Sequence, residues 1–323
     1  MNFHWYLIIF LSLFILTGCQ SSNLSHPNQK ILNTEVVESK PTGTSIKTPT
    51  QKPTQAPSPT PPVQVNKDIL YVEPLQSNVS EQRLDVYAPN GEGPWPVIVF
   101  LHGLSQTKER FIEESLWIAE QGIVVYTINW PNWNSAIAIQ ENGRGFRETY
   151  EVLSCAVRYA KATAANFGGN PSKIILVGYS AGARYGSWFA LSGDTNVTKW
   201  EEISATRGGP NSQVSCLVDG YSPNVDAFVG IGGHYAFIEN LKDKDVDLYN
   251  VVSPFAQIGE RPELSVRLLH GDEDDFPISF SAKLNDVLET SGYDTELIIF
   301  DGGHVVSLDP TIKVIFDLAG IKQ

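Results

Sequence analysis

Short apolar runs recur along residues 65–323, and segments with helical periodicity separate most of them. Runs without a polar residue, such as 97–101, are typical of strands buried on both faces of a parallel sheet. Strands that alternate with helices predict crossover connections and a sheet covered on both faces. The expected strands are 69–72, 84–87, 97–101, 123–128, 173–178, 227–231, 266–270 and 296–300.

The segments between these runs have apolar residues at helical spacing. The expected helices are 107–121, 147–166, 180–191, 279–291 and 311–318. Because the first two strands are joined by a short connection, we expect them to form an antiparallel edge. Residues 65–323 therefore predict one α/β domain, with a mostly parallel, doubly wound sheet of about eight strands and helices on both faces.

An apolar run at residues 5–16 is too short to cross a bilayer. It is followed by Leu16-Thr17-Gly18-Cys19, which resembles the lipobox of bacterial lipoprotein signals. The resemblance implies a signal peptide at 1–18 and a lipidated Cys19 that anchors an exported, extracytoplasmic domain to the cell envelope membrane. Residues 1–4 contain no Lys or Arg. A generic cleaved signal peptide, in which Cys19 has no role, therefore remains the alternative interpretation.

Residues 19–64 are rich in Ser, Thr, Pro, Gln and Asn, and the stretch 48–62 contains no large apolar side chain. Such a segment cannot bury enough apolar surface to offset its ordering entropy. We interpret it as a disordered tether. The alternative is a disordered segment whose length has no functional importance.

The charge balance is acidic, with 23 Lys and Arg against 36 Asp and Glu and a formal net charge of -13. No basic run appears along the chain, whereas nucleic-acid binding proteins carry a basic patch or stripe. The sequence therefore argues against nucleic acid as a partner.

The pentapeptide GYSAG at 178–182 follows the apolar run 174–177 and matches the G-x-S-x-G pattern. A serine held on a sharp turn between a buried strand and a helix needs small neighbours, so that the backbone can bend and a substrate carbonyl can approach. The pattern predicts Ser180 as a nucleophile. An ordinary strand-to-helix turn is the alternative.

Three further landmarks follow expected strands. The strand at 97–101 runs into His102-Gly103, the strand at 266–270 runs into GDED with Asp274 at its end, and His304 comes after the last strand. With Ser180, these residues resemble the landmarks of the α/β-hydrolase family over essentially all of 65–323. The order Ser, Asp, His is the one that this fold uses.

The resemblance implies a role for each landmark. Ser180 is the nucleophile, His304 the base that takes its proton, and Asp274 the acid that orients the imidazole. The backbone N–H groups of Leu104 and Ala181 form the oxyanion hole.

Other residues compete for two of these roles. His234 follows an expected strand end and is the alternative base. The acidic run at 272–275 offers Asp275 as a substitute acid, and a solvated loop or a cation site is its plainer interpretation.

Candidate pocket residues lie after strand ends, where open α/β sheets bind ligands. They are Tyr179, Asn129, Trp130, Trp133 and His234. The expected helix after the GYSAG turn, which we call the elbow, adds Ala183, Arg184, Tyr185 and Trp188. The tryptophans could instead pack at the rim of the core. The pattern resembles feruloyl-esterase-like and dienelactone-hydrolase-like esterases, with serine in place of the cysteine of the latter.

Two cysteines remain after Cys19. Cys155 lies on an expected helix, and Cys216 lies in the long excursion 192–224 between the elbow helix and the next strand. A disulfide between them is plausible in an exported protein. It would limit how far the excursion could move if this segment acted as a lid. Two separate buried thiols are the alternative.

Together, these features predict a serine carboxylic-ester hydrolase that works through an acyl-enzyme, without metal or cofactor. Its substrate would be a small-molecule or polymer-borne ester. A lipase or phospholipid acylhydrolase, a serine peptidase and a non-catalytic binding module on the same fold are the alternatives. The sequence predicts neither the natural ester nor the oligomeric state.

Overall fold

The computed structural model of the protein describes residues 63–73, 82–131, 138, 140–207 and 214–321. The predicted signal peptide at 1–18, Cys19, nearly all of the predicted tether and Trp133 lie outside the described residues. Among the helices within these ranges, none has both the length and the apolar character needed to cross a membrane.

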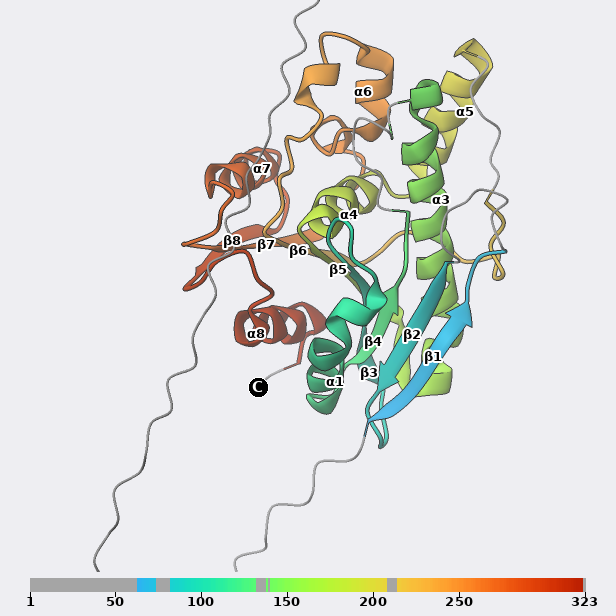
Figure 1. Ribbon diagram of the computed structural model, residues 1–323, viewed down its shortest axis with the longest axis vertical. Helices are drawn as coiled ribbons and strands as arrows, with labels where there is room; N and C mark the ends of the chain where they lie inside the picture. Colours follow the sequence, from blue (N-terminus) through green and yellow to red (C-terminus); the bar gives the residue numbers. More distant parts are fainter. Residues whose placement is uncertain (1–62, 74–81, 132–137, 139, 208–213, 322–323) are drawn as a thin grey trace, which may run out of the picture. The chain divides into compact units, whose positions relative to one another are not determined.

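A sheet of eight strands forms the centre of the described residues, in the order β1-β2-β4-β3-β5-β6-β7-β8 (Figure 1). β2 pairs antiparallel with β1 and with β4, and the other neighbouring strands pair in parallel. This topology confirms the predicted mostly parallel sheet with an antiparallel edge. The strands are β1 (Gln64–Leu70), β2 (Arg83–Ala88), β3 (Trp95–Leu101), β4 (Val124–Ile128), β5 (Gly169–Tyr179), β6 (Ala227–Ile231), β7 (Ser265–Gly271) and β8 (Thr295–Phe300).

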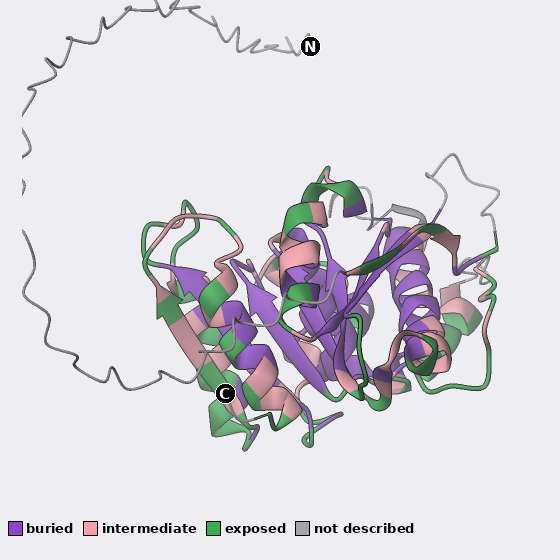
Figure 2. Ribbon diagram, turned by 90° about the horizontal axis from the view of Figure 1, so that it is seen from below, coloured by how far each residue is buried: buried purple, intermediate pink, exposed green. Residues whose placement is uncertain are grey.

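Helices cover both faces of this sheet, with α1 and α8 on one face and the other helices opposite (Figure 1). The helices are α1 (Ile112–Glu120), α3 (Gln140–Thr163), α4 (Ala181–Ser192), α5 (Thr195–Arg207), α6 (Val246–Val252), α7 (Ser279–Thr290) and α8 (Leu308–Ala319). Figure 2 shows the sheet as a buried layer, with exposed residues on the outer sides of the helices. The architecture is that of a doubly wound α/β fold.

The strand β3 shows why the central runs are wholly apolar. Val97, Val99 and Leu101 pack in the core cluster that includes residues of α3 and α4. Ile98 and Phe100 pack in the cluster that includes residues of α1 and α8. Because successive side chains point to opposite faces, a strand covered on both sides needs apolar residues at every position.

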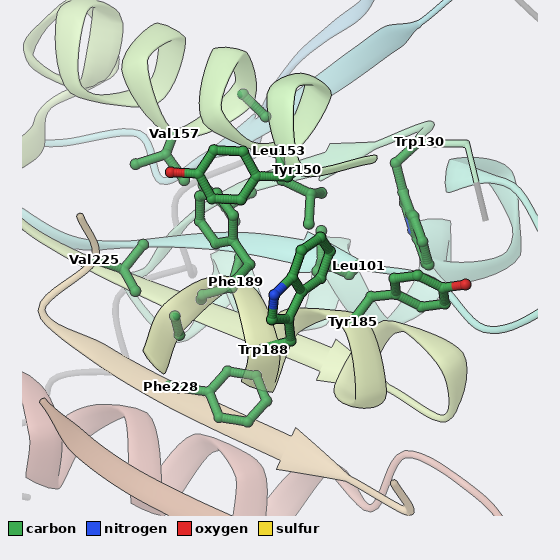
Figure 3. Close-up of a cluster of buried hydrophobic side chains, with 14 of the residues drawn as sticks. Leu101, Trp130, Tyr150, Leu153, Val157, Tyr185, Trp188, Phe189, Val225 and Phe228 are labelled. Atoms are coloured by element: carbon green, nitrogen blue, oxygen red, sulfur yellow. The ribbon is translucent and has the colours of Figure 1, made fainter. Parts of the chain in front are cut away.

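An aromatic cluster fills the space between the sheet and the helices on the α4 side (Figure 3). Trp188 is fully buried, and its ring lies 5.8 Å from that of Phe146 of α3. Trp188 Nε1 donates a hydrogen bond to the carbonyl oxygen of Val251 in α6. The elbow helix α4 is therefore fixed to the sheet, to α3 and to α6.

Two α-helices in the described part of the chain were not predicted. α5 lies inside the excursion 192–224, and α6 lies between β6 and β7. In α5 only Asn196, Trp200 and Ile203 are buried, so the apolar face is too sparse to read from sequence. α3 also begins at Gln140 rather than at 147, because glycines in its first turns, such as Gly143, oppose helix in a local reading.

A disulfide joins Cys155 of α3 to Cys216, with the two Cα atoms 5.0 Å apart. Val72 also forms an isolated antiparallel bridge with Cys216. Further along, Lys161 Nζ of α3 donates to the carbonyl oxygen of Asn224 at 2.6 Å. The last part of the excursion is therefore fastened to α3, which leaves little freedom for this part to move as a lid.

Candidate active site

Ser180 lies on the turn between β5 and α4, at the carboxyl edge of the sheet. Its φ and ψ are +54° and -112°, a backbone conformation that residues other than glycine rarely adopt. Its N–H donates to the carbonyl oxygen of Ile231 in β6 at 2.8 Å, which holds the turn against the neighbouring strand. The hydroxyl therefore projects from a sharp, strained elbow.

The elbow needs glycine at position 182. A Cβ there would lie 2.3 Å from the carbonyl oxygen of Leu101 and 2.8 Å from that of His102. No side chain fits in that space, so Gly182 lets α4 start directly beside the end of β3.

His304 and Asp274 form a hydrogen-bonded pair at the same edge of the sheet. His304 Nδ1 lies 2.8 Å from Asp274 Oδ2, and the Asp274 side chain is 1% exposed. The other oxygen, Oδ1, accepts the N–H of Phe276 at 2.8 Å. A neutral imidazole that donates from Nδ1 to a carboxylate presents Nε2 as an acceptor, which is the form that a general base requires.

Tyr179 holds the His304 loop through a hydrogen bond and a ring contact. Its hydroxyl donates to the His304 carbonyl oxygen at 2.8 Å, and the two rings lie 5.0 Å apart. Tyr179 directly precedes Ser180, so one strand end holds both the elbow and the histidine loop.

His270 positions the loop that carries Asp274. It is fully buried, with Nδ1 2.8 Å from Ser281 Oγ and Nε2 2.8 Å from the carbonyl oxygen of Phe276. Since Phe276 in turn donates its N–H to Asp274, the buried imidazole fixes the turn that presents the carboxylate.

A pocket of about 110 Å³ opens at Ser180. Gly232, one of its lining residues, packs against His304, because a Cβ at this position would lie 2.9 Å from His304 Nδ1. Gly232 therefore lies between this pocket and the His304–Asp274 pair. It is lined by Leu104, Ser180, Ala181, Arg184, Gly232, His234 and Phe276.

Comparison with known proteins assigns this chain to a family. A family model described as BD-FAE matches residues 84–288, a span that includes Ser180 and Asp274. The chain belongs to the BD-FAE family.

The BD-FAE chain is similar to curated esterases and to solved esterase structures. The isoprenylcysteine alpha-carbonyl methylesterase ICME of Arabidopsis thaliana is 26% identical over 256 residues, which cover 74% of this chain and 56% of that protein. The chain spans about half the length of the methylesterases it matches first.

Two solved structures share the fold of the BD-FAE chain. A truncated carbohydrate esterase from gut microbiota has a TM-score of 0.59 at 17% identity, covering 82% of this chain and 99% of that one. Esterase 2 of Thermogutta terrifontis phosphorylated by paraoxon has a TM-score of 0.55 at 15% identity, covering 82% and 97%. With the eight-stranded sheet, this likeness shows an α/β-hydrolase fold.

The predicted oxyanion-hole residues both line the pocket of this BD-FAE protein. Ala181 is the first residue of α4, so its N–H has no partner within the helix. Leu104 follows Gly103, whose N–H donates to Gln106 Oε1 at 3.0 Å. Burial lowers the pKa of His102, just before this turn, to about 4, so its ring is neutral at pH 7.

Asp274 is the member of the acidic run that meets a histidine in the described part of the chain. Asp275 and Glu273 are exposed, and Asp272 Oδ1 accepts the N–H of Gly302 at 2.9 Å. Within the described ranges, no three His, Cys, Asp or Glu residues are grouped as metal ligands.

Two of the predicted pocket residues, Arg184 and His234, line the pocket at Ser180 in the described chain. The ring of His234 stacks on Phe280 with centroids 3.9 Å apart. Burial, and then the charge of Arg184, lower the pKa of His234, so it is neutral at pH 7. It is not bonded to a carboxylate as His304 is, among the described residues.

The prediction that Asn129 and Trp130 line this pocket is wrong. Asn129 Oδ1 accepts the N–H of Lys108 at 2.8 Å, so the amide joins the end of β4 to the segment before α1. Trp130 is 4% exposed and lies between His102 and Tyr185, with ring centroids 5.5 and 5.3 Å away (Figure 3). An aromatic residue at a strand end gains more from joining the core than from remaining in solvent.

Proposed function

We propose that the protein is a serine esterase that cleaves carboxylic esters through an acyl-enzyme intermediate. Ser180 is the nucleophile, His304 the general base and Asp274 the acid that orients it. The N–H groups of Leu104 and Ala181 stabilise the oxyanion. The lipid-anchored, exported location stays a prediction from the sequence.

One observation carries this proposal. Ser180, on its strained turn, and Gly232 line one small pocket, and Gly232 lies against the hydrogen-bonded His304–Asp274 pair. A merely structural turn has no need of a positive φ at a serine, and backbone strain of this kind gathers at functional sites. The names of the similar proteins, a methylesterase and two esterases, support the same chemistry.

The reaction begins when Ser180 Oγ attacks the ester carbonyl and His304 takes the hydroxyl proton. Asp274 holds the ring and stabilises the imidazolium that forms. Negative charge develops on the carbonyl oxygen and is met by the two backbone N–H groups. His304 then gives its proton to the departing alcohol. Water, activated by the same histidine, releases the acid and restores Ser180.

We expect short acyl groups to be preferred. The pocket of about 110 Å³ is small beside the ~300–1,000 Å³ of sites that enclose drug-sized ligands. In a series of p-nitrophenyl esters from acetate to octanoate, kcat/KM should be highest at two to four carbons and fall at least about tenfold by octanoate. The leaving group stays constant, so the series reports the acyl site alone. A steady rise towards octanoate would instead support the lipase alternative.

Gly232→Ala should impair catalysis without unfolding the protein. Gly232 has a φ of +59°, and an added Cβ would lie 2.9 Å from His304 Nδ1 and 3.2 Å from Asp274 Oδ2. We expect kcat/KM for p-nitrophenyl acetate to fall about 10²-fold, the usual cost of displacing a catalytic group by about 1 Å.

The matched control is Gly259→Ala, at a φ of +103° where an added Cβ meets nothing within 4 Å. It also places a Cβ at a positive φ, but away from the pocket. Equal activity in the two variants, measured with melting temperatures, would show that Gly232 does not determine the position of the pair.

A further inference from the structure

Arg184 lies one helical turn beyond the nucleophile. Its N–H donates to the carbonyl oxygen of Ser180 at 3.1 Å, and its side chain lines the same pocket as Ser180 and Ala181. Ala181, the first residue of α4, and Arg184 are three residues apart on the helix and share one face, with Cβ atoms about 5–6 Å apart. A guanidinium at this position is therefore within reach of groups a few bonds from an ester bound at Ser180.

The charge of Arg184 has no counter-ion in the described part of the chain. Other half-buried arginines are paired: Arg147 with Glu151 at 2.9 Å, and Arg207 with Asp245 at 2.8 Å. Arg184 Nε is shielded from solvent and has no hydrogen-bond partner among the described residues. Burial lowers the pKa of Arg184, although an arginine remains protonated at neutral pH. Among the described residues no carboxylate offsets the cost of this partly desolvated cation.

Aromatic rings hold this guanidinium in place. It lies over the ring of Phe237 at 4.5 Å and near that of Tyr185 at 5.3 Å. Contact through the flat face restrains the side chain and leaves the N–H groups at its edge available. That edge is the part of arginine that binds a carboxylate through two parallel hydrogen bonds.

The rest of the pocket strengthens such an interaction. Phe276 lines it, and His234, stacked on Phe280, is neutral at pH 7. Among the described lining residues no carboxylate is present to compete for the guanidinium. In a site with apolar walls, a charge pair is screened less than it is in water.

We propose that Arg184 binds a carboxylate carried by the ester substrate, so that the protein prefers esters with a negative charge a few bonds from the scissile carbonyl. This inference rests on the proposed esterase function and specifies its substrate class. The carboxylate could belong to the acyl part, as in a half-ester of a dicarboxylic acid, or to the alcohol part, as in an ester of a hydroxy acid.

Two matched substrate pairs test the proposal and separate the two sources. Monoethyl succinate against ethyl 4-methylpentanoate places a carboxylate or an isopropyl group on the acyl side. 3-Acetoxypropanoate against 3-methylbutyl acetate does so on the alcohol side. In a pH-stat assay, the wild type should favour the anionic member of at least one pair, and Arg184→Met should lower that ratio of kcat/KM values by at least about tenfold.

Two further variants separate charge recognition from a structural role. Arg184→Lys should restore part of the anionic preference, because it keeps a cation without the bidentate edge. Arg267→Met should keep the wild-type ratio, because Arg267 bonds Asp294 at the opposite end of β7. The proposal is overturned if Arg184→Met leaves both ratios unchanged.

A binding measurement does not depend on turnover. Calorimetry with succinate and with 3-hydroxypropanoate, the carboxylate-bearing fragments of the two substrates, should detect binding of at least one to the wild type and its loss in Arg184→Met. Binding that persists in Arg184→Met, or no binding to the wild type, counts against the proposal. If no ester is hydrolysed by any variant while succinate binding still depends on Arg184, the esterase function fails and the anion site stands.

Discussion

Ser180→Ala is expected to abolish both ester hydrolysis and labelling by a fluorophosphonate probe. Without the hydroxyl no acyl-enzyme forms, and only the oxyanion hole and substrate binding remain to assist water. Removing a nucleophile of this type lowers kcat by roughly 10⁶-fold in a comparable triad. The measurement is hydrolysis of p-nitrophenyl acetate, with intact mass after probe treatment to count the groups attached.

The control for this variant is Ser187→Ala on the same helix. Ser187 is fully buried, and its hydroxyl bonds the carbonyl oxygen of Arg184 at 2.8 Å, so its loss tests a serine of α4 that does not face the pocket. The Ser187→Ala variant should be labelled by the probe and should hydrolyse p-nitrophenyl acetate as the wild type does. Wild-type activity in Ser180→Ala would refute the proposed nucleophile.

The sheet could be predicted because its signal is local. A strand buried on both faces must be apolar at every position, as β3 and residues 174–177 of β5 are, and such runs stand out in a chain of mixed composition. The helices α5 and α6 were missed because little of α5 is buried and α6 is short. α6 packs against Trp188 and α3, and α5 packs against α6; such tertiary contacts are not contained in a local pattern.

The site could be anticipated only where its residues sit at fixed places in a motif. Ser180, Asp274 and His304 each follow a strand whose end lies at the same edge of the sheet, so the topology explains why Asp274 and His304 meet and why Ser180 lies at that edge. Gly232 and His270 act through contacts that their own segments do not reveal. Asn129 and Trp130 were misassigned for the same reason, since an aromatic residue at a strand end can face a pocket or the core.

Asp274→Asn should lower kcat by about 10⁴-fold while leaving the fold intact, if Asp274 orients the base. The amide is similar in shape to the carboxylate, and its oxygen can still accept the N–H of Phe276. Its NH₂ group, however, would face His304 Nδ1, where Asp274 Oδ2 now lies at 2.8 Å. That contact favours a proton on Nε2, so the ring can no longer accept the proton of Ser180. The measurement is kcat for p-nitrophenyl acetate, with circular dichroism to check folding.

Asp275→Asn is the matched control, since it makes the same chemical change one residue later on an exposed side chain. Its activity should stay near that of the wild type, because position 275 has no hydrogen bond to His304. The reverse result, a large loss in Asp275→Asn and none in Asp274→Asn, would move the acid to the neighbouring residue. The comparison is decisive because the two variants share charge, volume and loop, and differ in which one touches the histidine.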